Sequence, residues 1–175
     1  KIANDLEIPL LYISTAGIFN GEKNVYDETD LPDPLGHYGR SKFLGEEFVQ
    51  KNSKNFIICR AGWMMGAGAN KDKKFIQKII QQIVDGKKTL HIVNDKLGTP
   101  TYTHDFAKNV KLILEKEQRG LFNMVCGGLT GRYEVATKLI SLMGLKNEIK
   151  IEEVNSDYFA EEYFAERPAC ERLIN

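Results

Sequence analysis

The sequence lacks a phosphate-binding glycine loop, since neither Gly-x-Gly-x-x-Gly nor Gly-x-x-Gly-x-x-Gly occurs in its 175 residues. It also lacks an excess of either charge, because 24 lysines and arginines balance 24 aspartates and glutamates. A balanced charge gives no support for nucleic acid or an anionic membrane as a partner. No apolar run is long enough to cross a bilayer, and no signal peptide is recognisable. We therefore expect neither nucleic acid nor a membrane as a partner.

Cysteine is scarce, and its placement indicates reduced thiols. Cys59, Cys126 and Cys170 are odd in number and widely spaced, which does not suit a disulfide framework. This pattern predicts a cytoplasmic protein. No cluster of histidine, cysteine and carboxylate residues has the spacing of a metal site, because the histidines are scattered at His37, His91 and His104. We therefore expect no metal.

The chain begins at Lys1 without a methionine, and residues 1–7 have the pattern of the end of a helix. Its last residues, 172–175, carry no recognisable terminating feature. We therefore expect the sequence to be a piece of a longer protein, which an intact-mass measurement of the natural gene product would test.

Short apolar runs alternate with segments of helical period, which is typical of an α/β protein with a parallel sheet. Three runs are apolar enough to be strands buried on both faces, and these are 8–14, 55–62 and 120–126. Shorter strands are predicted at 90–93 and 150–154, and helices at 38–52, 72–86, 104–117 and 130–143. Three long buried strands are too few for a complete doubly wound sheet.

The predicted helix 38–52 has apolar residues that suggest an inner face. We expect Leu44, Phe48 and Val49 to face the sheet, and Glu46 and Glu47 to face water.

Arg60 lies at the end of a predicted buried apolar strand, where an unpaired guanidinium would be costly. We therefore expect Arg60 to have a partner.

The stretch Tyr38-Gly39-Arg40-Ser41-Lys42 carries a tyrosine and a lysine four residues apart at the start of this helix. That spacing puts both side chains on one face, where the ammonium group favours the ionised phenol. Such a pair could give a proton to a substrate oxygen or take one from it. The alternative is a tyrosine and a lysine on a solvated helix face.

Small polar residues follow the first buried strand, in Ser14-Thr15-Ala16-Gly17. Open α/β sheets bind ligands at the carboxyl ends of their strands, so a hydroxyl here could hydrogen-bond a substrate carbonyl. An ordinary strand-to-loop cap explains the same residues equally well. Trp63, after the second strand, is either a core anchor or a flat wall for a sugar or a base.

Taken in order, five segments resemble the C-terminal part of an extended short-chain dehydrogenase/reductase and, more narrowly, the dTDP-4-dehydrorhamnose reductase family. They are Ser14-Thr15; the stretch from Tyr38 to Lys42; Arg60-Ala61-Gly62-Trp63 with Gly66; Gly98-Thr99-Pro100-Thr101-Tyr102 with Asp105; and Arg167-Pro168. The resemblance implies the C-terminal half of a Rossmann-like parallel sheet with a small α/β substrate-binding lobe. It assigns residues 1–66 and 97–127 to the sheet domain, and residues 67–96 and 128–175 to the lobe.

The resemblance also implies roles for individual residues. Tyr38 would protonate the sugar C4 carbonyl oxygen, Lys42 would hold the nicotinamide ribose, and Thr15 would hydrogen-bond the carbonyl. Cofactor contacts would come from Ser14, Tyr38, Lys42, Arg60 and Ala61, and substrate contacts from Ala16, Trp63, Thr99, Thr101 and Arg167. The implied function is reduction of a 4-keto nucleotide sugar with NADPH or NADH by a cytoplasmic enzyme that could form a homodimer.

Two departures from the family pattern keep alternatives open. Ala16 stands where the reductases usually carry aspartate, and Met64-Met65 stands where they usually carry a Val-Tyr-like pair. Epimerases and dehydratases of the same superfamily share the tyrosine and the lysine. Some relatives are binding modules, such as the regulatory β subunit of methionine adenosyltransferase. Without the glycine loop, we expect these residues alone to bind a dinucleotide weakly or not at all.

Overall fold

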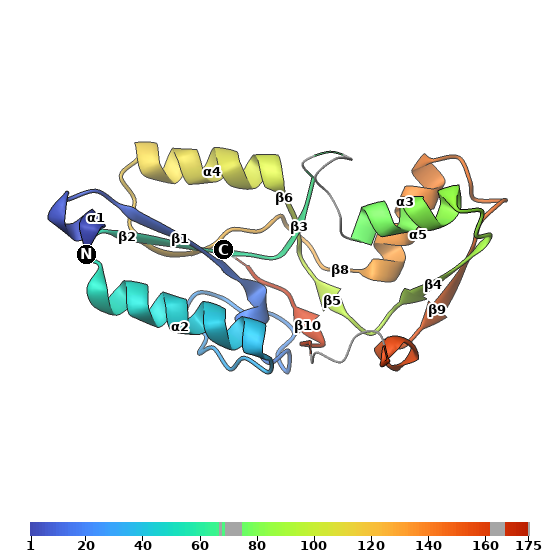
Figure 1. The fold of residues 1–175 in the computed structure, drawn as a ribbon, viewed down its shortest axis with the longest axis horizontal. Helices are drawn as coiled ribbons and strands as arrows, with labels where there is room; N and C mark the ends of the chain where they lie inside the picture. The colour runs from blue at the N-terminus through green and yellow to red at the C-terminus, as the bar shows by residue number, and fades with distance from the viewer. Residues whose placement is uncertain (67, 69–74, 162–166, 175) are drawn as a thin grey trace.

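The computed structural model describes residues 1–66, 68, 75–161 and 167–174. Two parts lie side by side along the long axis of the molecule (Figure 1). One part is built on a three-stranded sheet and the other on a two-stranded sheet, with short strands between them. The predicted α/β class with parallel sheets is confirmed.

The larger sheet consists of three parallel strands: β1 (Leu10–Thr15), β2 (Phe56–Ala61) and β7 (Gly120–Asn123). β2 is central, and the register pairs Ser14 with Arg60 and Thr15 with Ala61. The loops that follow β1 and β2 therefore leave the same edge of the sheet. The short helix α1 (Ile2–Asp5) precedes β1, and the 3-10 helix η1 (Ala16–Ile18) follows it.

Helices cover both faces of this sheet: α2 (His37–Asn52) lies on one face and α4 (Thr103–Glu115) on the other (Figure 1). Alternate residues of β2 point to opposite faces, as the period of a strand requires. One set packs in a buried cluster with Phe106 of α4 and Met124, and its members are Ile57, Cys59 and Ala61. Arg60 points to the other face, where it meets α2.

The predicted orientation of α2 is confirmed for Val49, which is buried, and for Glu47, which is exposed, but it is wrong for the other three residues. Leu44 and Phe48 are 55% and 67% exposed, whereas Glu46 is only 1% exposed. The inward stripe consists of Gly39, Lys42, Glu46 and Val49, which are three or four residues apart, as one helix face requires. The sequence pattern misled because this stripe contains two charged residues, and both of them find partners on the sheet.

The second part packs two helices on a two-stranded parallel sheet. Its elements are α3 (Phe75–Val84), β4 (Thr89–Val93), α5 (Arg132–Leu142) and β9 (Lys150–Val154), followed by the 3-10 helix η2 (Ser156–Phe159). Their apolar faces form one core with Ile79, Leu90, Ile92, Ala136, Ile140 and Ile149. Residues 72–74 of the predicted helix 72–86 lie outside the described residues.

Short strands join the two parts. β3 (Trp63–Met65) runs parallel to β6 (Pro100–Tyr102). β5 (Leu97–Gly98) pairs with β8 (Thr130–Gly131) and with β10 (Cys170–Glu171) near the end of the chain. Leu173 then bridges to Tyr26, so the final described residues contact the first half of the chain. The division into 1–66 with 97–127 and 67–96 with 128–175 stays a prediction.

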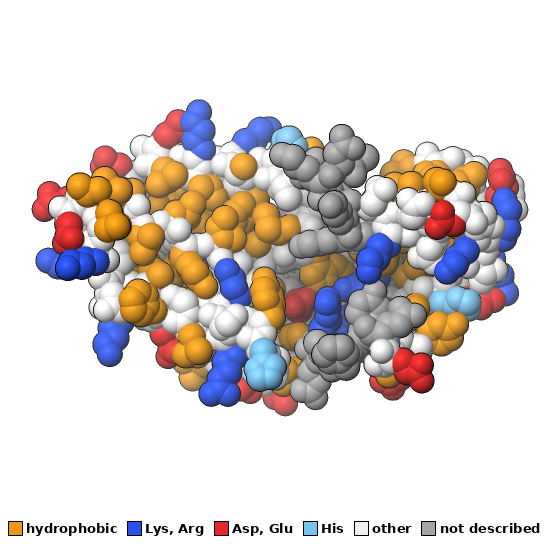
Figure 2. All heavy atoms as spheres, in the orientation of Figure 1, with side chains coloured by type: hydrophobic (Ala, Val, Ile, Leu, Met, Phe, Trp, Pro, Cys, Tyr) orange, Lys and Arg blue, Asp and Glu red, His pale blue; other side chains and the backbone are white. Residues whose placement is uncertain are grey.

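An apolar surface lies over β1 and α2. Figure 2 shows hydrophobic side chains gathered on this face of the molecule. Exposed members on or beside these elements include Ile8, Leu10, Ile13, Leu44 and Phe48. β1 pairs with β2 along one side, and within the described part of the chain no strand pairs with its other side.

Among the described residues, no helix has the length and hydropathy needed to span a membrane.

Candidate active site

The end of β1 carries the two hydroxyl residues of the candidate site, and their surroundings differ. Ser14 is only 3% exposed, and its Oγ has no hydrogen-bond partner among the described residues. Thr15 precedes η1, and its Oγ1 accepts a hydrogen bond of 3.2 Å from the Gly17 N–H. A hydroxyl oxygen that accepts one bond can still donate its own proton. Thr15 is therefore both a loop cap and an available donor.

The start of α2 is held against this loop by a close approach of two glycines. A Cβ atom on Gly39 would lie 2.2 Å from the Gly17 carbonyl oxygen, a distance that no side chain tolerates. Gly39 is buried, while the neighbouring Tyr38 is 66% exposed. This contact brings the Tyr38 end of α2 to the carboxyl end of β1, beside Thr15.

The Lys42 ammonium group is fixed to the same strand. Its Nζ donates a hydrogen bond of 2.5 Å to the Ile13 carbonyl oxygen and lies 4.6 Å from the centroid of the Tyr12 ring. The Tyr12 hydroxyl donates in turn to the Lys42 carbonyl oxygen at 3.2 Å. Thr15, the Lys42 ammonium group and the first turn of α2, which carries Tyr38, therefore lie at the carboxyl end of β1.

A buried ion pair ties α2 to the central strand. Arg60 donates through Nε and Nη2 to the Glu46 carboxylate, at 3.0 Å to Oε1 and 2.7 Å to Oε2. The two side chains are 3% and 1% exposed. The sequence predicted that Arg60 needs a partner, and Glu46 is that partner. Arg60 Nη1 has no partner among the described residues, and the neighbouring Ala61 is 3% exposed.

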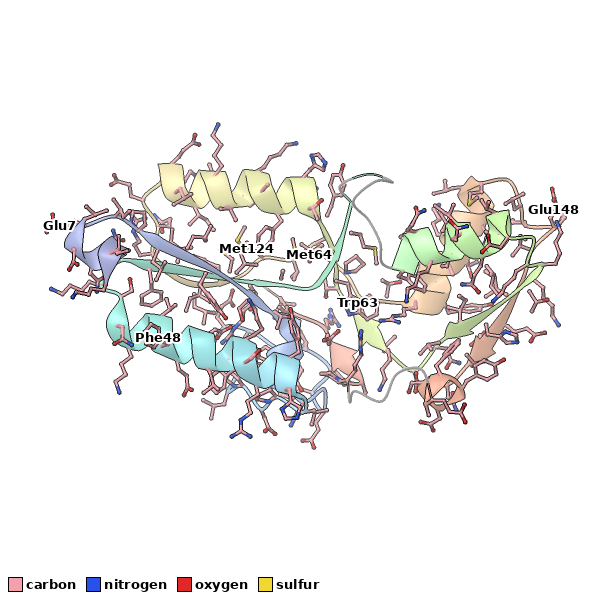
Figure 3. All side chains as sticks on the ribbon, viewed as in Figure 1. Glu7, Phe48, Trp63, Met64, Met124 and Glu148 are labelled. Carbon is pink, nitrogen blue, oxygen red and sulfur yellow. The ribbon has the colours of Figure 1, made fainter. Side chains whose placement is uncertain are left out.

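Trp63 is half-buried at the junction of the two parts (Figure 3). Its indole Nε1 donates a hydrogen bond of 2.5 Å to Oε2 of Glu171 on β10. The guanidinium carbon of Arg132, the first residue of α5, lies 5.8 Å from the Trp63 ring centroid, within the range of a cation–π interaction. Gly98 packs so close that a Cβ atom there would lie 2.6 Å from the indole.

The remaining predicted contacts lie in more enclosed or more distant places. Thr99 and Thr101 are buried, and their hydroxyls bond the Gly128 carbonyl at 3.2 Å and the Gly62 N–H at 3.1 Å. Ala16 is 1% exposed and packs in a core cluster. The Arg167 side chain is exposed. A role in cofactor binding for Arg60 and Ala61, and in substrate binding for Ala16, Thr99, Thr101 and Arg167, stays a prediction.

Sequence reasoning missed two carboxylates near this site. Glu46 could have been found, because Arg60 in an apolar strand requires a carboxylate and Glu46 shares a helix face with Lys42. Glu171 carried no such signal, since 108 residues separate it from Trp63. Only the pairing of β10 with β5 brings the two together.

Fold and site together define an α/β protein with candidate proton-transfer groups at the carboxyl end of a parallel strand. The RmlD substrate binding domain family matches residues 1–175, so the chain belongs to that family. A dTDP-4-dehydrorhamnose reductase from Yersinia enterocolitica superposes with a TM-score of 0.90 and 36% identity, covering 98% of this chain and 59% of the other. The dTDP-4-dehydrorhamnose reductase from Bacillus anthracis, in complex with NADP, superposes with a TM-score of 0.90 and 25% identity. The match covers 99% of this chain and 59% of the other.

Two curated proteins are also similar to this chain over most of its length. The spore coat polysaccharide biosynthesis protein SpsK of Bacillus subtilis is 34% identical over 140 residues, which are 79% of this chain and 48% of that protein. The methionine adenosyltransferase 2 subunit beta of Danio rerio is 26% identical over 141 residues, which are 78% of this chain and 44% of that protein. The chain therefore spans about half the length of these two relatives.

Proposed function

We propose that the complete protein reduces the C4 carbonyl group of a nucleotide sugar, as an oxidoreductase of the short-chain dehydrogenase/reductase type. The observation that supports this proposal is that Thr15, the Lys42 ammonium group and the first turn of α2, which carries Tyr38, lie at the carboxyl end of β1. The similarity to dTDP-4-dehydrorhamnose reductases supports dTDP-4-dehydrorhamnose as the substrate. The 175 residues alone would be inactive, because they contain no pyrophosphate-binding glycine loop.

The three side chains supply what carbonyl reduction needs apart from the hydride. The Thr15 hydroxyl donates a hydrogen bond to the carbonyl oxygen and polarises it. The Tyr38 hydroxyl transfers its proton to that oxygen as the carbon is reduced, so that the carbonyl becomes a secondary alcohol. The Lys42 ammonium group stabilises the phenolate left on Tyr38. Each of these groups acts without a metal ion.

NADPH is the proposed cofactor, supported by the NADP complex of the Bacillus anthracis reductase. When bound, it supplies the hydride. The residues of this chain suit its nicotinamide-ribose end. The Lys42 ammonium has three donors, so its bond to Ile13 leaves capacity for ribose hydroxyls. The buried Ser14 Oγ, unpartnered among the described residues, offers a further polar contact beside it.

A second candidate is a binding role without turnover. The similarity to the methionine adenosyltransferase 2 subunit beta favours it, since that protein is named as a subunit of another enzyme. A binding module needs no proton donor, whereas this chain retains Tyr38 with Lys42. Assembly as a homodimer and a cytoplasmic location stay predictions from the sequence and its resemblance.

The test is NADPH oxidation by the complete natural protein, followed by absorbance, with a panel of 4-keto nucleotide sugars. We expect turnover with dTDP-4-dehydrorhamnose and slower turnover with sugars that carry a different nucleotide. A folded protein that binds NADPH but oxidises it with no member of the panel would contradict a reductase and favour the binding role. Comparison with NADH in the same assay decides the cofactor.

A further inference from the structure

Glu171 occupies a position that the proposed roles leave unused. It is half-buried on β10, where the register pairs it with Gly98 of β5. Both residues contact Trp63: Gly98 packs against the ring, and Glu171 accepts the indole N–H at 2.5 Å. The indole is therefore contacted by two neighbouring strands.

The second oxygen of the same carboxylate faces the loop after β1. Glu171 Oε1 lies 3.2 Å from the position that a Cβ atom on Gly17 would occupy, and Thr15 Oγ1 lies 3.6 Å from that same position. Both oxygens therefore border the same space beside Gly17. Glu171 thus contacts Trp63 through one oxygen and, through the other, faces the segment that carries the hydroxyl proposed to polarise the substrate carbonyl.

We infer that Glu171 is a positioning and specificity-determining residue of this site. Oε2 holds the indole of Trp63 in place as a wall for the sugar, and Oε1 accepts a hydrogen bond from the sugar next to the reacting carbon. The sugar-binding half of this inference rests on the proposed function. The positioning half rests on the contacts of Trp63 alone.

The charge of Glu171 defines the class of sugar that fits. An ionised carboxylate only accepts hydrogen bonds, so it favours a sugar that presents a hydroxyl or an ammonium group at this point. It disfavours a sugar that carries a carboxylate, because two negative charges would be brought together. The site should therefore accept neutral or amino sugars and reject acidic sugars.

The first experiment measures the environment of Trp63 in the complete natural protein without ligand. Trp63 is the only tryptophan in this sequence, and the same protein with Trp63→Phe supplies the background. We expect Glu171→Ala to raise the acrylamide quenching of Trp63 fluorescence about twofold, because the indole loses its hydrogen-bond partner. Glu171→Gln keeps an acceptor and should stay near the wild type. Glu47→Gln, at an exposed position of α2, is the matched control.

The second experiment titrates these variants with dTDP and with dTDP-rhamnose, the alcohol expected from the proposed reaction. Binding of dTDP reports the nucleotide alone, so the ratio of the two dissociation constants isolates the sugar. We expect Glu171→Gln and Glu171→Ala to lose about tenfold of the preference for dTDP-rhamnose, the size of one hydrogen bond to a charged group. Their affinity for dTDP should not change.

Each outcome decides part of the inference. Unchanged quenching in Glu171→Ala would overturn the positioning role, whatever the protein binds. Equal losses of affinity for both ligands would indicate a structural effect and overturn the specificity role. A wild type that binds neither ligand would overturn the proposed function and, with it, the specificity role, while the quenching result would still decide the positioning role.

Discussion

The Glu46 carboxylate and the Arg60 guanidinium form an ion pair that solvent hardly reaches, with Arg60 Nη2 2.7 Å from Glu46 Oε2. This pair connects the central strand β2 to the helix that carries Tyr38 and Lys42. Removing one partner would leave the other charge buried and uncompensated. The pair therefore sets how α2 sits on the sheet.

We expect Glu46→Ala to lower the free energy of unfolding by about 3–5 kcal/mol, the usual cost of breaking a buried pair from one side. The double variant Glu46→Leu with Arg60→Met should recover most of that loss, because no buried charge remains. Urea unfolding of the three proteins measures both effects. Glu47→Ala, on the exposed side of α2, should change stability by less than about 0.5 kcal/mol. A similar, small loss in Glu46→Ala would show that the pair is not buried.

The contact between Gly39 and Gly17 predicts a substitution that affects activity through the helix. A methyl group in Gly39→Ala would collide with the Gly17 carbonyl oxygen, because its Cβ would lie 2.2 Å away. We expect α2 to shift, stability to fall by about 1–3 kcal/mol, and Tyr38 to be displaced from Thr15. Thermal unfolding and kcat measure the two effects. Gln50→Ala, exposed on the same helix, is the control and should leave both unchanged.

Cys59 predicts a dependence of stability on pH. It is fully buried in β2, and burial raises the pKa of its thiol from 9.0 to about 11. The folded protein therefore holds this proton more tightly than the unfolded chain does, so the stabilisation is complete below pH 9 and is lost as the pH rises toward 11. Over that pH range the free energy of unfolding of the wild type should fall by up to about 2–3 kcal/mol more than that of Cys59→Ala. Identical pH slopes for the two proteins in urea unfolding would contradict this.

Lys42 predicts a loss of catalysis with little loss of stability. Lys42 is half-buried as a residue, and its Nζ is hydrogen-bonded to the Ile13 carbonyl oxygen, where it is proposed to hold the ribose and stabilise the Tyr38 phenolate. Lys42→Met should lower kcat/KM for NADPH-dependent reduction by about 10²-fold or more. Lys42→Arg keeps the charge but not the shape, so only partial activity is expected. Steady-state kinetics, normalised to the concentration of folded protein, measure this effect. Full activity in Lys42→Met would exclude the proposed role of Lys42 in catalysis.

The sequence predicted the α/β class and the positions of the three parallel strands, because near-continuous apolar runs are typical of such strands. The predicted burial of 8–14 on both faces was wrong, since Leu10 and Ile13 of β1 are 36% and 44% exposed.

The sequence also failed for Leu44, Phe48 and Glu46 on α2. A pattern based on apolar residues places Leu44 and Phe48 on the inner face and charged residues outside. Only the position of Arg60 on β2 shows why Glu46 turns inward.

The candidate site also contains some residues that the sequence could locate and one that it could not. Thr15, Tyr38 and Lys42 follow from local sequence, since each lies on or next to one strand or helix terminus whose position the pattern predicts. Glu171 depends on a pairing between β10 and β5, two short strands far apart in the chain. Strands of two residues have no hydrophobic period, so no local pattern could reveal this contact.

The measurement that tests the central claim most directly is single-turnover reduction of dTDP-4-dehydrorhamnose by the complete protein with bound NADPH, wild type against Tyr38→Phe. The phenyl ring keeps the shape of the side chain and removes only the proton donor. We expect rapid turnover in the wild type and a loss of about 10²–10⁴-fold in Tyr38→Phe, with cofactor binding retained. Equal rates in the two proteins would contradict the assignment of Tyr38 as the acid.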